Sequence, residues 1–218
     1  MNTNDKTPGL IAGIVILVAL AAGATALLSL TDSATEAQRR ENQAVHAARL
    51  LREVIPAGEY DPQPGLLSIT LEDAELLGTA EPVPAYPVYR NGEAAGVVLT
   101  VIAPDGYVAP LTLLVGIDTA GTISGVRVTG HRETPGLGDK VEPAKSDWIT
   151  TFTGRSFATT PRADWSLARD GGDYDHISGA TITSRAVVTA TANALDYFSA
   201  NRSLLLGPPP APAGELAD

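Results

Sequence analysis

The chain has 218 residues, a length that favours one globular domain with attached segments. Its formal net charge of -10, from 25 acidic and 15 basic side chains, disfavours nucleic acid as a partner, because phosphates require a basic surface. The absence of cysteine excludes disulfides, thiolate zinc sites and iron–sulfur clusters, so any redox chemistry needs another kind of cofactor.

An uncharged segment lies near the amino terminus. Residues 9–30 carry no charge over 22 positions, and roughly 1.5 Å per residue gives about 33 Å of helix, enough to cross a bilayer core of about 30 Å. A cleaved signal peptide is the alternative, since Ala24-Thr25-Ala26 resembles a cleavage site, but the apolar region of a signal peptide runs only about 7–15 residues. We therefore predict a retained transmembrane helix over 9–30, preceded by residues 1–8. Its orientation is not decided by the flanking positive charges.

A helical stalk is predicted between this segment and the domain. Residues 33–36, SATE, have the pattern of a capping box, and a modest apolar stripe at helical spacing follows. Pro56 ends the pattern, which gives a stalk over residues 31–56. A proline-rich stretch then continues to residue 87, with a short helix expected from Leu71 to Leu77.

The hydrophobic period changes to that of strands at residue 87. Residues 87–103 read as a strand, an Asn91-Gly92 turn and a second strand, because Asn-Gly tolerates the positive φ of tight hairpins. Residues 111–118 and 122–130 form a second pair of predicted strands. Several antiparallel strands are therefore expected.

Two helices are predicted after the strands. Residues 146–154, SDWITTFTG, favour a short helix in which Trp148 and Phe152 both face the core. A longer helix near the carboxyl end has an apolar face formed by Val187, Val188, Thr191, Leu195 and Phe198. We place the domain at residues 57–203 and a proline-rich, disordered tail at 204–218.

The stretch DHISGATITSRAV, residues 175–187, places the hydroxyls of Ser178, Thr181 and Thr183 within six positions directly before the longer helix. Free amides and the positive end of the helix dipole stabilise an anion at such a position, and phosphate is the usual one. The alternative is that one Ser or Thr merely caps the helix. Gly179 and Ala180 favour a ligand, because they leave room for it to approach the backbone.

The run D-H-I-S-G-A-T, residues 175–181, resembles the flavinylation motif of the periplasmic FMN-binding domain family. In that family the final threonine carries FMN through a phosphoester, which a dedicated flavin transferase installs. The resemblance implies covalent FMN on Thr181. The neighbouring site residues that it implies are Asp175, Ser178, Gly179 and Ala180. Thr183 and Ser184 are competing hydroxyls that spacing alone does not exclude.

A second stretch, GHRETPGLGDK at residues 130–140, resembles the family's E-T-P-G-L-G loop, which lies against the isoalloxazine ring. Alone, Pro-Gly-Leu-Gly reads as an ordinary turn. The resemblance implies polar contacts with the ring edge from Glu133 and Thr134, an apolar contact from Leu137, and close backbone approach at Gly136 and Gly138. Residues 106–118 resemble the family's G-Y-x-x-P strand entry, so three motifs occur in the expected order.

Over about residues 85–200, and with its single anchor, the chain resembles the family of G subunits of the Rnf electron-transport complex. The related family of C subunits of the sodium-pumping NADH:quinone oxidoreductase is the alternative; it shares the motifs but is usually longer. The resemblance implies an α+β fold, with one transmembrane helix followed by a mostly antiparallel sheet with helices. It also implies a cytoplasmic amino terminus and a periplasmic FMN domain at the bacterial inner membrane.

The implied function is a flavoprotein subunit that relays electrons in an ion-translocating ferredoxin:NAD oxidoreductase. The chain lacks a nucleotide-binding fingerprint, so NADH and ferredoxin are expected on other subunits, and no complete active site is expected in this chain alone. Expected partners are the integral membrane subunits, one of which carries a second covalent FMN, and the flavin transferase during maturation. The competing class is a non-redox, membrane-anchored assembly or anion-binding module.

Other chemistries have little support. His46, His131 and His176 show no paired spacing, so no metal site is expected, and the latter two read as loop residues. Ser178 does not lie on a G-x-S-x-G elbow, which disfavours a serine hydrolase. Lys140 reads as a surface residue.

Overall fold

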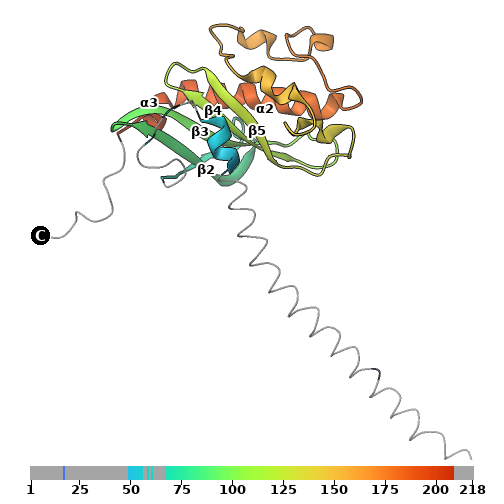
Figure 1. Cartoon of the computed structure of the whole chain (residues 1–218), viewed down its shortest axis with the longest axis horizontal. Helices are drawn as coiled ribbons and strands as arrows, with labels where there is room; N and C mark the ends of the chain where they lie inside the picture. Colours follow the sequence, from blue (N-terminus) through green and yellow to red (C-terminus); the bar gives the residue numbers. More distant parts are fainter. Residues whose placement is uncertain (1–16, 18–48, 56–57, 59, 61–66, 209–218) are drawn as a thin grey trace, which may run out of the picture. The chain divides into compact units, whose positions relative to one another are not determined.

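The computed structural model describes residues 17, 49–55, 58, 60 and 67–208. A five-stranded antiparallel sheet with one long helix across it forms their framework (Figure 1). Its strands are β1 (Ile69–Asp73), β2 (Thr79–Arg90), β3 (Glu93–Ala103), β4 (Leu111–Asp118) and β5 (Ile123–Gly130), in the order β1-β2-β3-β4-β5. Helix α2 (Thr181–Ala200) is followed by the short helix α3 (Arg202–Leu205). The predicted combination of an antiparallel sheet with helices is confirmed.

The sheet is a meander in which each strand pairs with the next one in sequence. Asn91 and Gly92 join β2 to β3 with φ angles of 52° and 80°, the left-handed values that Asn-Gly accommodates in tight hairpins. Both predicted strand pairs are therefore confirmed. Strand β2 is longer than expected, because it begins at Thr79 and includes prolines that the sequence pattern assigned to irregular structure.

The short helix predicted from Leu71 to Leu77 is wrong. Residues 69–73 form β1, and the chain then turns. The carboxylate of Asp73 accepts hydrogen bonds from the amides of Glu75 and Leu76 at 3.0 and 2.8 Å, so its side chain stabilises a turn in place of a helical one. Leu71 and Leu77 are both buried in the core.

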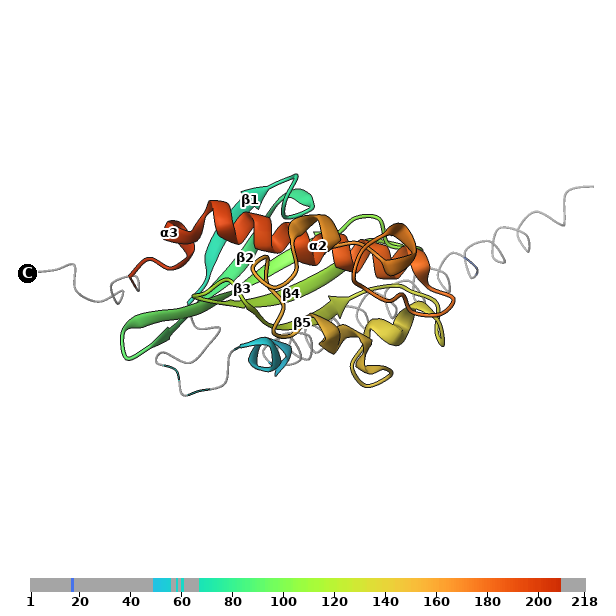
Figure 2. The same ribbon diagram turned by 90° about the horizontal axis from the view of Figure 1, so that it is seen from above.

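Helix α2 covers one face of the sheet, where it packs on β3 and β4 (Figure 2). Alternate strand residues such as Val97, Leu99 and Val115 point to this face and are almost fully buried. All five residues of the predicted apolar face of the helix belong to the same core: Val187, Val188, Thr191, Leu195 and Phe198. Their burial fixes the rotation of the helix.

The opposite face of the sheet is covered by the helical residues 49–54, blue-green in Figure 1. Leu50, Leu51 and Val54 pack against the alternate strand residues, which include Val98 and Leu114. The last turns of the predicted stalk are therefore a packed part of the domain. The domain accordingly begins before residue 57, the start that the proline-rich composition suggested.

Between β5 and α2 the chain makes an excursion with four short 3-10 helices: η1 (Gly138–Val141), η2 (Asp147–Phe152), η3 (Arg162–Asp164) and η4 (Ala168–Asp170). An aromatic cluster holds it to the core. The ring of Phe152 stacks on those of Trp165 and Tyr174 at centroid distances of 6.3 and 5.0 Å, and meets the ring of Trp148 edge-on at 5.5 Å. The predicted short helix with Trp148 and Phe152 facing inward is η2.

The two ends of the chain fall largely outside the described residues. The predicted tail boundary at residue 204 lies too early, because α3 follows α2 directly, Leu205 is buried and the hydroxyl of Tyr89 donates to the carbonyl of Gly207 at 3.1 Å. Among the described residues, no helix combines the length and the apolar character needed to span a bilayer. The predicted membrane segment 9–30 lies outside them except for Leu17.

Glycine in the strands determines whether residues 49–54 can pack on the sheet. A Cβ atom at Gly116 would lie 1.9 Å from the carbonyl oxygen of Val54, whereas one at Gly130 would meet Thr112 at an ordinary 3.6 Å. We expect Gly116→Ala to displace this helix and to lower the free energy of unfolding by about 1–3 kcal/mol, the usual cost of overpacking. Gly130→Ala is the matched control. Urea unfolding and hydrogen exchange at residues 49–54 measure both effects, and equal behaviour of the two variants would contradict the expectation.

Candidate functional site

A cavity of about 460 Å³ lies where the loop after β5 meets the start of α2. Its volume falls in the range of small-molecule sites, roughly 300–1,000 Å³. Seven of the ten predicted site residues line it: Glu133, Thr134, Leu137, Gly138, Gly179, Ala180 and Thr181. It is completed by Tyr107, Ile182 and Thr183. Two motifs separated by about forty residues of sequence therefore share one cavity.

Helix α2 begins at Thr181 without a side-chain cap. Ala180 occupies the N-cap position, and no side chain there accepts a hydrogen bond from the first turn. The interpretation of a Ser or Thr as a simple N-cap is therefore wrong. The amide of Ser184 is the first to bond within the helix, to the carbonyl of Ala180 at 2.9 Å. The amides of residues 181–183, all of which line the cavity, have no helical acceptor and remain able to bind an anion.

Three hydroxyls in the first turn of α2, those of Thr181, Thr183 and Ser184, have different surroundings. Thr183 is fully buried and donates to Glu133 Oε2 at 2.7 Å. Ser184 is also buried; it donates to the carbonyl of Ala180 and accepts from the amide of Ile177, both at 2.9 Å. Thr181 is only partly buried, and its Oγ1 lies 3.4 Å from an Arg169 guanidinium nitrogen. Of these three residues, only Thr181 is partly exposed.

The carboxylate of Glu133 joins three segments of the chain. It is buried, and its Oε2 accepts from Thr183 on α2 while its Oε1 accepts from the amide of Val108 at 3.3 Å. Its own amide donates to His131 Nδ1 at 3.2 Å. We call these hydrogen bonds of Glu133 to Thr183 and Val108 the Glu133 brace. The sequence did not predict it, because neither Thr183 nor Val108 is near Glu133 in sequence.

Three glycines in or beside the cavity have different roles. Gly136, with φ 79°, follows Pro135 in a turn that is closed by a 3.2 Å bond from the amide of Leu137 to the carbonyl of Thr134. It therefore forms the turn and does not line the cavity. Gly138 does line the cavity, and a side chain there would collide with Glu133, since a Cβ atom would lie 2.6 Å from Glu133 Oε2.

Gly179 has φ 80°, and a Cβ on it would lie 2.9 Å from the side chain of Leu137. Gly179 of one motif therefore lies beside Leu137 of the other. Leu137 nevertheless keeps 43 % of its surface exposed, and Tyr107, Val108 and Ile182 are exposed by 64, 54 and 48 %. Large apolar side chains that remain this exposed around a cavity are suited to cover a flat apolar ligand.

Ion pairs hold the loop that carries the E-T-P-G-L-G motif. Lys145 Nζ lies 2.9 Å from Asp139 Oδ2 and 2.7 Å from Glu142 Oε1, and His131 Nε2 lies 3.0 Å from the same Glu142 oxygen. Hydrogen bonds from Lys145 are the main cause that lowers the pKa of Asp139 and of Glu142. The hydrogen bond to Glu142 is the main cause that raises the pKa of Lys145.

Several other residues singled out in the sequence do not line the cavity. The side chains of Asp175, Ser178 and His176 are exposed, although the carbonyl of Asp175 accepts a 2.7 Å bond from the indole of Trp148 and so fixes the loop. Lys140 is partly buried in η1 and is not among the lining residues. Conversely, Tyr107 lines the cavity from within the G-Y-x-x-P motif, where only the motif as a whole pointed to it. Arg169 belongs to none of the three motifs, so only the fold reveals it.

Removing the hydroxyl of Thr183 tests the brace. Thr183→Val keeps the shape of the side chain but leaves the buried Glu133 carboxylate short of a donor. We expect the free energy of unfolding to fall by about 1–3 kcal/mol, the typical cost of an unsatisfied buried polar group. Thr189→Val is the matched control, because Thr189 is exposed on the same helix. Urea denaturation followed by circular dichroism compares them; an unchanged Thr183→Val midpoint would argue against the brace.

The Lys145 ion pairs predict a defined pH dependence of stability. The ordinary pKa values of Asp139 and Glu142 are 3.8 and 4.5, and both are lowered by folding, so their contribution is present above these values and is lost as the pH falls through the folded values. The pKa of Lys145 is raised from 10.5, so its contribution is complete below that value and is lost as the pH rises through the folded value.

We therefore expect Lys145→Met to reduce the free energy of unfolding at neutral pH and to converge with the unmodified protein in acid and in strong base. Denaturant titrations at a series of pH values measure this difference. A constant difference across the acid range would exclude these ion pairs as its source.

Comparisons with known proteins agree with this geometry. The model of the FMN-binding domain family matches residues 106–196, which span β4, β5, the excursion and most of α2. The G subunit of the ion-translocating oxidoreductase complex of Pseudomonas aeruginosa is 44 % identical over 189 residues, covering 87 % of this chain and 88 % of that protein. The Vibrio atlanticus protein of the same name is 39 % identical over 201 residues, with 92 % and 96 % covered, and that of Shewanella piezotolerans is 37 % identical with 92 % of each covered. This chain therefore belongs to the family of G subunits of ion-translocating oxidoreductase complexes.

Proposed function

We propose that this protein is a flavin-carrying subunit of an ion-translocating oxidoreductase complex and that Thr181 carries FMN through a phosphoester. The observation that carries the proposal is a partly exposed threonine hydroxyl at an uncapped helix start, in the lining of a cavity with exposed apolar side chains. The family membership of the chain and its match to the FMN-binding domain model support it.

The residues present fit both parts of FMN. An ester phosphate on Thr181 stays anionic, and the free amides of residues 181–183 can stabilise it together with the helix dipole. The isoalloxazine ring is flat, with apolar faces and polar edges, and the side chains of Leu137, Ile182 and Tyr107 are exposed around the cavity where they could cover such a face. Gly179 provides the space beside Leu137, since a Cβ there would collide with it.

Each group of residues has a separate task in the proposed function. FMN supplies the electron-transfer chemistry, and the protein fixes its position. The helix start holds the phosphate, the apolar rim limits access of water to the ring, and the Glu133 brace keeps the wall segments together. Thr134, which lines the cavity on an exposed turn, is a candidate for polar contact with the ring edge.

The remaining parts of the architecture are also proposals. Residues 9–30 carry no charge and would anchor the chain in the inner membrane, with residues 1–8 in the cytoplasm and the FMN domain in the periplasm. The relatives are named as subunits of an oxidoreductase complex, which supports partnership with other subunits of such a complex. We propose the integral membrane subunits as neighbours, with NADH and ferredoxin bound elsewhere in the complex.

Covalent attachment can be tested by mass. Protein produced together with a flavin transferase of verified activity should gain the mass of FMN less one water, and the flavin should survive denaturation. Thr181→Ala should abolish the gain completely, because the other two hydroxyls of the helix start, on Thr183 and Ser184, are buried and already hydrogen-bonded. Thr189→Ala, which removes an exposed hydroxyl from the same helix, should keep the full gain.

Two results would contradict the proposal in different ways. Flavin that resists denaturation in Thr181→Ala would move the linkage to another residue. An unchanged mass of the unmodified sequence, at verified transferase activity, would reject a flavoprotein and favour an assembly or anion-binding module.

A further inference from the structure

A guanidinium lies beside the proposed attachment hydroxyl. The Arg169 Nη1 atom is 3.4 Å from Thr181 Oγ1, and the arginine side chain is exposed. Within the part of the chain that the structure describes, the ion pairs include no carboxylate on Arg169. Arg162 and Arg185 of the same region do have such partners, at 2.6 and 2.7 Å. Arg169 is therefore a cation of this region that is available to a ligand.

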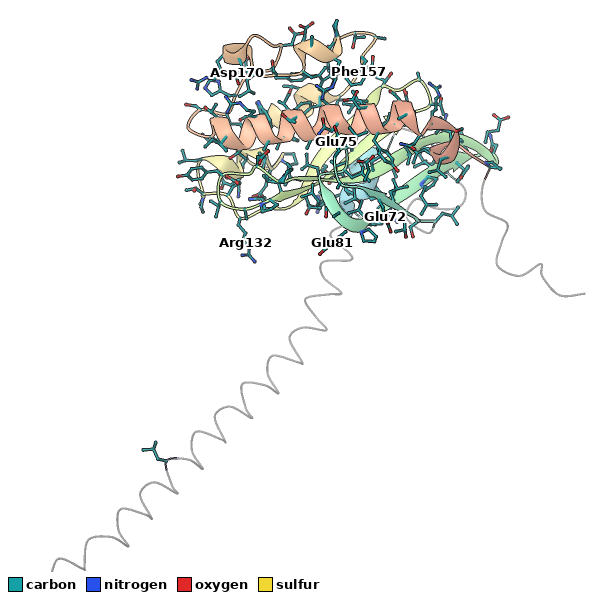
Figure 3. The ribbon with its side chains drawn as sticks, turned by 180° about the vertical axis from the view of Figure 1, so that it is seen from behind. Glu72, Glu75, Glu81, Arg132, Phe157 and Asp170 are labelled. Carbon is teal, nitrogen blue, oxygen red and sulfur yellow. The ribbon has the colours of Figure 1, made fainter. Side chains whose placement is uncertain are left out.

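The turn that carries Arg169 is tied to both the core and the helix. In η4 the amide of Ala168 donates to the carbonyl of Tyr174 at 2.7 Å, and the adjoining Leu167 is fully buried. Asp170, labelled in Figure 3 beside the end of α2 that begins at Thr181, accepts two hydrogen bonds from Arg185 at 2.9 and 2.7 Å. Arg169 is thus held at a fixed place relative to the first turn of α2.

The charges of this turn leave one net positive charge next to the helix start. Arg185 neutralises the carboxylate of Asp170, so the guanidinium of Arg169 adds to the positive end of the helix dipole without opposition from its neighbour. A guanidinium matches a phosphate with paired hydrogen bonds, whereas a hydroxyl offers it only one weak contact. The distance of 3.4 Å to Thr181 places it where an ester phosphate on that oxygen would lie next to it.

We propose that Arg169 is a phosphate-binding residue that holds the ester phosphate on Thr181, and that the Asp170–Arg185 pair positions it. This inference rests on the proposed covalent FMN. It assigns a role to residues 162–174, a part of the excursion that carries none of the motifs. Because Arg169 is proposed to position the phosphate, its test measures a property of that phosphate group.

The phosphorus NMR resonance of the flavinylated protein reports on this contact. We expect Arg169→Gln to shift the ester resonance and to slow flavin attachment about tenfold, the size expected for loss of one charge-assisted hydrogen bond. Arg169→Lys keeps the charge but not the fork of donors, so its resonance should lie between the two. Arg52→Gln is the control: Arg52 is exposed and lies on the helix that covers the opposite face of the sheet, and its resonance should match that of the unmodified sequence.

The outcomes separate this inference from the proposed function. A resonance in Arg169→Gln that coincides with the unmodified one overturns the inference, even if attachment is slower, because slower attachment alone indicates a role in transferase recognition. If Arg169→Gln carries too little flavin to measure, the Arg169→Lys variant takes its place: a resonance that coincides with that of the unmodified protein overturns the inference, and a shifted one supports it. Absence of flavin from the unmodified sequence would instead reject the proposed function. Equal melting temperatures of all variants exclude a folding defect.

Discussion

The buried carboxylate of Glu133 is the contact on which the cavity depends. It accepts hydrogen bonds from the β3–β4 connection through Val108 and from α2 through Thr183, while it lies itself in the loop after β5. A buried carboxylate is costly without such donors, so the three segments stabilise each other through one group. The close fit extends to Gly138, where any side chain would meet the same carboxylate. Contacts within the protein therefore hold the wall of the cavity together.

The residues around the cavity offer two kinds of surface, one electropositive and one apolar. Free amides and Arg169 make the helix start electropositive, although the whole chain carries a net charge of -10. Apolar side chains of the same lining, those of Tyr107, Leu137 and Ile182, are exposed. Local geometry thus overrides the overall acidic composition, which alone would have argued against an anion site.

Much of the fold could be predicted because its signals are local. The Asn91-Gly92 turn and the alternating strands indicated the hairpins, and the spacing of Val187 to Phe198 indicated the buried face of α2. The helix expected at Leu71 to Leu77 is wrong because the side chain of Asp73 hydrogen-bonds to the backbone amides of Glu75 and Leu76 and stabilises a turn there. Seven of the predicted site residues line the cavity, and they could be predicted because they belong to two sequence motifs. Arg169 and the partners of Glu133 were missed, since their contacts join segments that only the tertiary structure brings together.

The meander has a consequence for the order of folding. Each strand pairs with its neighbour in sequence, so the sheet can assemble by successive hairpins with short loops to close. The bonds of Glu133 instead span 25 residues to Val108 and 50 residues to Thr183. We expect these long-range contacts to form late, when α2 docks on a sheet that already exists. The wall segments of the cavity would then meet only in the last step of folding, after the sheet has formed.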